Sequence, residues 1–170
     1  MSDKKHGGQR LPDLLRPGLN LVVCGTAASS ESATRGQYYA GPGNRFWTVL
    51  YEIGLTDRLL DPSEFGLLPD YGIGLTDIVK DQDGMDSEID FKNAGTLLRQ
   101  RLDFSAPRYL CFNGKRAARE ALGSKKVAYG PQGESFGPTR LFVAPSTSAA
   151  ARRWWDAAAW GELARLVKSG

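Results

Sequence analysis

The sequence has one histidine, two cysteines and no long apolar run, and each shortage excludes a class of protein. His6 lies in a polar N-terminal segment, so a mechanism that needs a histidine in the folded core is excluded. Cys24 and Cys111 lie in apolar segments and lack the spacing of metal ligands, so both are expected to be core thiols in a reducing compartment. We therefore expect neither a metal site nor another cofactor.

No run of about 18 apolar residues occurs, and no apolar segment follows the polar residues 1–5. We therefore expect no membrane span and no secretory signal, and we expect the protein to be cytoplasmic. The formal net charge of +3 is small enough to arise by chance on a surface of mixed sign, so it permits a DNA partner without demonstrating one. The chain also lacks a glycine-rich phosphate-binding fingerprint, which argues against a flavodoxin-like nucleotide-binding domain.

The 170 residues, 41% of them hydrophobic, are enough for one domain with a substantial core. We predict a mobile N-terminal tail over residues 1–10 and a single domain over residues 11–170. Apolar strand-like segments alternate with helical patterns, which predicts an α/β fold: a three-layer α/β/α sandwich with a central, mainly parallel sheet of four or five strands. The expected strands are 19–24, 71–79, 107–114, 127–129 and 140–143, and the main expected helices are 44–53, 91–102, 115–122 and 149–168.

The densest chemistry lies between Gly25 and Trp47, in the stretch GTAASSESATRGQYYAGPGNRFW. The stretch follows an expected strand and precedes an expected helix, which is where ligands of α/β sheets bind. Tyr38 and Tyr39 stand close to Gly41-Pro42-Gly43, where flexible and stiff residues together can present an aromatic ring to a planar ligand. The alternative is that these rings pack into the core of the loop itself.

This stretch resembles the first motif of the uracil-DNA glycosylase superfamily, in its mismatch-specific uracil/thymine and hypoxanthine branches. A glycine that ends the first strand, a proline-flanked aromatic and Asn44-Arg45-Phe46-Trp47 all match without gaps. Pro145-Ser146 after the last strand resembles the second motif, whose loop pinches the phosphate backbone. Two positions depart from the family pattern: Ala27 replaces the asparagine that positions the attacking water, and Ala144 replaces a histidine or asparagine.

The resemblance implies a monomeric DNA repair glycosylase that flips a deaminated base, with uracil as the first candidate, out of DNA and hydrolyses its N-glycosidic bond. An abasic site would remain. The alternative is a catalytically weak or inactive protein of the same fold that binds damaged DNA, which the two alanines favour. In either case the partner is DNA containing uracil or another deaminated base, with no obligate protein partner. The expected base-binding residues are Thr26, Ala27, Tyr39 and Asn113, and the expected DNA-binding residues are Ser146, Thr147, Ser148, Arg152 and Arg153.

Several of these roles have physical support of their own. Tyr39 would stack on the flipped base, and backbone N–H groups near Thr26 and Ala27 would donate to a base carbonyl as negative charge develops there. Arg152 and Arg153 could reach phosphates. They could equally be a solvent-facing pair on an amphipathic helix.

Two residues are candidates for the catalytic role that Ala27 cannot fill. Asp77 is flanked by Leu75 and Ile78, and a carboxylate in apolar surroundings is costly to desolvate unless it is paired or functional. Asp77 could instead cap a helix or end an exposed strand. Asn44 could position the water, or it could cap the following helix.

Overall fold

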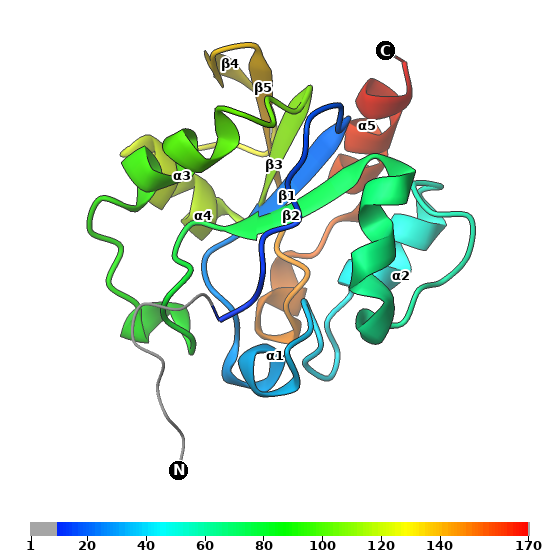
Figure 1. Ribbon diagram of the computed structural model, residues 1–170, viewed down its shortest axis with the longest axis horizontal. Coiled ribbons are helices and arrows are strands. Elements are labelled where there is room, and N and C mark those ends of the chain that lie inside the picture. The colour runs from blue at the N-terminus through cyan, green and yellow to red at the C-terminus, as the bar shows by residue number, and fades with distance from the viewer. Residues whose placement is uncertain (1–9, 170) are drawn as a thin grey trace.

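Five strands form one central sheet in the computed structural model, which describes residues 10–169. Four strands, in the order β2-β1-β3-β5, run parallel, and β4 is antiparallel to β5 at one edge. This arrangement confirms the predicted α/β fold with a mainly parallel sheet (Figure 1). The strands are β1 Leu21–Gly25, β2 Ile73–Asp77, β3 Tyr109–Asn113, β4 Gly130–Phe136 and β5 Thr139–Ala144.

Helices cover both faces of the sheet because successive side chains of each buried strand point to opposite sides. In β1, Leu21 and Val23 belong to the apolar cluster beneath α2 (Phe46–Glu52) and α5 (Ala157–Lys168). Val22 and Cys24 belong to the opposite cluster, beneath α3 (Ala94–Leu102) and α4 (Lys115–Leu122). The two clusters confirm the predicted three layers.

Shorter helices lie in the connections: α1 Ser30–Arg35, and the 3₁₀ helices η1 Pro62–Tyr71, η2 Asp86–Glu88 and η3 Ala149–Trp154. The prediction of one continuous helix over 149–168 is wrong, because the chain is extended at Trp155 and Asp156 between η3 and α5. The Asp156 side chain accepts a hydrogen bond from the N–H of Ala158 and so begins a new helix there.

The predicted strand at 127–129 is also wrong. The strand in this part of the chain is β4, which begins at Gly130 and occupies residues that were expected to form a loop. Only the two ends of β4, Gly130 and Phe136, are buried, so its sequence carries no apolar pattern. It is an edge strand that is ordered by backbone pairing with β5, and an edge position also tolerates Pro131.

The tail predicted over residues 1–10 falls almost entirely on residues 1–9, which lie outside the described residues. Arg10 itself is joined to the fold: its backbone N–H donates to the carbonyl of Lys80, and its side chain pairs with Asp83 at 2.8 Å. Within residues 10–169, no helix combines the length and the apolarity that crossing a membrane requires.

The parallel strands bring four loops to one edge of the sheet. Gly25 at the end of β1 is the register partner of Asp77 at the end of β2, and Asn113 at the end of β3 is the partner of Ala144 at the end of β5. Ligands of open α/β sheets bind at this edge, beyond the carboxyl ends of the strands. Residues far apart in the sequence therefore meet there.

Candidate active site

A cavity of about 560 Å³ opens at the carboxyl edge of the sheet, and nearly all of the predicted site residues line it. Its volume is in the range of small-molecule and nucleobase sites. Arg152 and Arg153 do not line it; both are exposed on η3. The predicted residues in its wall are Thr26, Ala27, Tyr39, Asn44, Asp77, Asn113, Ser146, Thr147 and Ser148.

Asp77 is the buried carboxylate of this cavity. It is the last residue of β2 and only 4% of it is exposed, yet it lines the cavity wall. The alternative of an exposed strand end is therefore wrong. A carboxylate that is removed from water but faces a cavity is placed to act on a ligand there.

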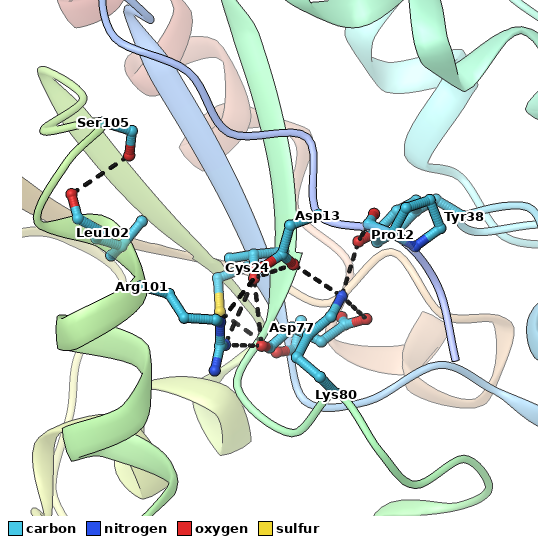
Figure 2. A network of polar contacts seen from close by, with 11 residues as sticks. Pro12, Asp13, Cys24, Tyr38, Asp77, Lys80, Arg101, Leu102 and Ser105 are labelled. Carbon is cyan, nitrogen blue, oxygen red and sulfur yellow. Dashed lines mark hydrogen bonds and ion pairs between the residues drawn. The ribbon is translucent and has the colours of Figure 1, made fainter. Parts of the chain in front are cut away.

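A network of charged side chains lies behind Asp77 (Figure 2). The Lys80 ammonium is 2.9 Å from Asp13 and 3.9 Å from the Asp77 carboxylate, and it donates to the Tyr38 hydroxyl at 3.0 Å. Arg101 pairs with Asp13 at 3.4 Å and donates to the backbone carbonyl of Asp77. Two carboxylates and two cations thus share one partly buried site, which fixes the end of β2.

Burial raises the pKa of the Asp77 carboxyl from its ordinary value of 3.8 to about 6. This value is the net result: the cations Lys80 and Arg101 lower the pKa and limit the effect of burial, whereas the neighbouring charge of Asp13 adds to it. Asp77 is therefore ionised at neutral pH but takes up a proton in mildly acidic solution.

This raised pKa predicts how Asp77→Asn changes stability. Between about pH 4 and pH 6 the folded protein binds the Asp77 proton more tightly than the unfolded chain does, so the parent loses stability as the pH rises through that range. The variant cannot ionise there. Urea unfolding should therefore show that, between pH 4 and pH 7, the free energy of unfolding of the variant rises by about 2 kcal/mol relative to that of the parent. A constant difference across that range would contradict the raised pKa.

Gly25 leaves a space that Asp77 and Tyr39 share. A Cβ atom on Gly25 would lie 2.8 Å from Oδ1 of Asp77 and 3.2 Å from the hydroxyl oxygen of Tyr39. The Tyr39 hydroxyl is buried and makes no hydrogen bond of normal geometry among the described residues, although the Asn113 side chain lies near enough to lower its pKa slightly. Burial and the charge of Asp77 raise the pKa of Tyr39 well above its ordinary value, so the phenol stays protonated.

The two tyrosines of the loop have different positions. The Tyr39 ring stacks on Phe46, with ring centres 4.2 Å apart. Tyr39 is half-buried and lines the cavity. Tyr38 is 1% exposed, donates to the carbonyl of Pro12 and packs edge-on against Phe65. The alternative of core packing is therefore confirmed for Tyr38, whereas Tyr39 presents an aromatic surface to the cavity.

Asn44 lies in the cavity wall but is bonded to the following helix. Its Oδ1 accepts a hydrogen bond from the N–H of Phe46 at 3.0 Å, the first residue of α2. Asn44 thus satisfies a free N–H at the start of the helix, as the capping alternative predicted, although the N-cap position itself is occupied by Arg45. Its side-chain N–H₂ is still available to the cavity.

Thr147 joins the loop after β5 to the end of β3 and to the stretch between Gly25 and Trp47. The Asn113 amide donates to the Thr147 hydroxyl and accepts from the Thr147 N–H, both at 3.0 Å. The Thr147 carbonyl in turn accepts from the N–H of Arg45 at 2.9 Å. Thr147 is 1% exposed, so its expected contact with DNA does not fit this structure; the flanking Ser146 and Ser148 remain accessible. Asn113 keeps one N–H and one lone pair for a ligand.

At the opposite wall, the Thr26 hydroxyl donates to the Asp86 carboxylate at 2.7 Å. Among residues 10–169, no group accepts a hydrogen bond from the backbone N–H of Thr26 or Ala27. These two donors can therefore serve a ligand. Ala27 adds only a methyl group to the wall.

Sequence reasoning missed four charged residues around this site: Asp13, Lys80, Asp86 and Arg101. Lys80 alone had a usable signal, because a lysine directly after the apolar pair Ile78-Val79 invites the question of what neutralises it. The described residues contain no group of three or more histidine, cysteine or carboxylate side chains placed to bind a metal ion.

Comparisons with known proteins agree with this geometry. The family model "Uracil DNA glycosylase superfamily" matches residues 12–164. The fold is similar to the solution NMR structure of a "putative Uracil DNA glycosylase" from Methanosarcina acetivorans, with a TM-score of 0.57 and 23% sequence identity over 93% of this chain and 96% of that chain. Since the family model spans most of its length, the chain belongs to the uracil-DNA glycosylase superfamily.

Proposed function

We propose that this protein is a monofunctional DNA glycosylase that extrudes a deaminated base, uracil foremost, from DNA and hydrolyses its N-glycosidic bond. The observation that carries the proposal is the buried Asp77 carboxylate, which faces the cavity at the carboxyl edge of a sheet of this superfamily.

Binding of the extruded base would use the Tyr39 ring and the free backbone donors. The ring offers a planar surface that Phe46 supports from behind. The N–H groups of Thr26 and Ala27 would donate to a carbonyl of the base, where negative charge develops as the base leaves. Asn113 would add a side-chain hydrogen bond from its remaining N–H.

Cleavage of the bond creates an oxocarbenium-like sugar, which a nearby anion stabilises. Asp77 would supply that charge and would orient the attacking water, since Ala27 has no polar group to do so. Water adds to the anomeric carbon, the C–N bond electrons leave with the base, and the proton of the water passes to the carboxylate or to solvent. Asn44 is the second candidate to position the water, through its free side-chain N–H₂.

Contacts with the DNA backbone would come from the loop after β5 and from η3. Ser146 and Ser148 lie at the cavity mouth, and the exposed Arg152 and Arg153 extend the same surface. Arg153 packs over the ring of Trp154 at 4.8 Å, which leaves its guanidinium on the outside. Serine hydroxyls and arginines are common partners of phosphates.

Replacing Tyr39 tests the stacking role. Tyr39→Ala should weaken binding of uracil-containing DNA by about fivefold to 150-fold, because stacking on an aromatic ring contributes about 1–3 kcal/mol per base. Tyr39→Phe keeps the ring and removes a hydroxyl that makes no hydrogen bond of normal geometry among the described residues, so it should bind nearly as the parent does. Equilibrium binding measures both. Equal affinity of Tyr39→Ala and the parent would assign the base to another surface.

A second function remains in view, a damage-binding protein with little or no catalysis. It is favoured by Ala27, which provides no water ligand, and by Ala144, which is fully buried and offers the cavity nothing polar. The two functions differ in a gel assay with labelled uracil, hypoxanthine and mismatched-thymine oligonucleotides followed by alkaline cleavage. Strand cleavage of the uracil substrate supports the glycosylase, whereas tight binding without cleavage on any substrate supports the damage-binding protein.

A further inference from the structure

A second groove, here called the flanking groove, continues from the cavity along the start of α4 and the end of η3. Its volume is about 480 Å³, and it shares part of its wall with the cavity, including Asn113, Ser146 and Ser148. A polymeric ligand with one unit in the cavity can therefore place its next unit in the flanking groove. The residues that distinguish it are Lys115, Arg119, Tyr129 and Trp154.

The charge of the flanking groove is mainly positive and not neutralised. Arg116 pairs with Glu120 at 2.9 Å, and the groove's carboxylate, Asp86, accepts the Thr26 hydroxyl. Lys115 and Arg119, one helical turn apart on α4, have no carboxylate within 4.0 Å among the described residues. Two cations on one wall of a groove favour an anionic ligand.

The groove also exposes aromatic surface. Trp154 is 58% exposed and Tyr129 is 39% exposed. The Lys115 ammonium lies 4.4 Å from the centre of the Tyr129 ring. Arg153 covers part of the Trp154 ring, and the rest of this exposed side chain is accessible to a ligand. Proteins that bind single-stranded nucleic acid combine cations, which contact phosphates, with exposed aromatic rings, on which bases stack.

We propose that the flanking groove binds the DNA strand next to the extruded nucleotide in single-stranded form, with its phosphates on Lys115 and Arg119 and a base stacked on Trp154. This inference rests on the proposed function, because it takes the cavity to hold a nucleotide. A paired base has both faces stacked in the duplex and cannot lie on Trp154. The substrate class is thus single-stranded or locally opened DNA.

Binding of a labelled 12-nucleotide single strand without uracil tests the charges, because it needs no catalysis. In a salt titration, Lys115→Gln/Arg119→Gln should lower the slope of log affinity against log salt by about 1.4, since each phosphate contact on a single strand contributes about 0.7. The matched control Lys125→Gln/Lys126→Gln removes the same charge from the neighbouring loop, outside the groove, and should keep the parent slope. Identical slopes for the groove variant and the parent would overturn the proposal.

Trp154 tests the stacking. Trp154→Ala should weaken single-strand binding by about fivefold to 150-fold, and Trp154→Phe, which keeps a ring, should retain most of the affinity. For a duplex of the same sequence, Trp154→Ala should weaken binding much less than it does for the single strand. Equal losses for single strand and duplex would reject the single-stranded substrate. Excision from a uracil-containing duplex, measured separately, decides the glycosylase function independently of these results.

Discussion

Replacing Asp77 with asparagine is expected to lower the rate of uracil excision at pH 8 by about 10²- to 10⁴-fold, the usual contribution of a positioned acid–base group. Asparagine has the same shape but no charge, so it can neither favour a cationic sugar nor take a proton from water. Binding of uracil-containing DNA should persist, since Asp77 is not proposed to hold the base. Single-turnover excision and equilibrium binding, measured on the same preparation, separate the two effects.

The dependence of the excision rate on pH, on its acid side, tests whether Asp77 is the ionised catalytic group. Because the pKa of Asp77 is about 6, excision by the parent should fall as the pH drops through about 6, when the carboxylate takes up its proton. The residual activity of Asp77→Asn should lack this limb. As a control, Asp83→Asn removes a nearby carboxylate that pairs with Arg10 and should leave the rate unchanged. A full rate in Asp77→Asn together with a loss in Asn44→Ala would transfer the role to Asn44.

Gly25→Ala should lower the excision rate by about 10²-fold or more. The new Cβ would lie 2.8 Å from the Asp77 carboxylate and 3.2 Å from the Tyr39 hydroxyl, so both side chains must move away from the floor of the cavity. A misplacement of about 1 Å in a catalytic group costs rate on this scale. The space left by the glycine is thus expected to serve the reaction as well as the packing.

Gly41→Ala is the matched control, because a Cβ at Gly41, in the same loop region, meets nothing within 4 Å. Thermal unfolding of both variants shows how much of any loss is instability, since overpacking costs about 1–3 kcal/mol. In an Asp77→Asn background, Gly25→Ala should cost less rate than it does in the parent, because the part of the loss that acts through the carboxylate is already gone and only the displacement of Tyr39 remains. An equal loss in both backgrounds would mean that Gly25 does not act through Asp77.

The elements that could be predicted from the sequence are those whose pattern of apolar residues directly reflects how they are buried in the fold. The buried strand around Val22 and Val23 is continuously apolar because both of its faces are covered, and such a run is visible in the sequence. β4 could not be found in this way, since only Gly130 and Phe136 are buried and its order comes from pairing with β5. An edge strand of this kind has no sequence signal before its partner is known.

The same contrast holds for the site. Asp77 was recognisable because a carboxylate between apolar neighbours is unusual, and parallel strands bring their ends together whatever the loops contain. Thr147 was misjudged because its pairing with Asn113 joins residues 34 positions apart, and no spacing in the chain reveals that contact. Asp13 and Arg101 were missed for the same reason: each reaches the network from a distant segment.

Direct detection of the free base tests the central claim, that this chain hydrolyses a base–sugar bond in DNA. Purified protein is incubated with a uracil-containing oligonucleotide, and both the released uracil and the abasic sites are quantified by mass spectrometry. An Asp77→Asn preparation made in parallel excludes a contaminating glycosylase from the host. The account predicts uracil and abasic sites in equal amounts from the parent and far less of both from the variant. If the parent protein binds the oligonucleotide but releases no uracil and leaves no abasic sites, the claim is contradicted.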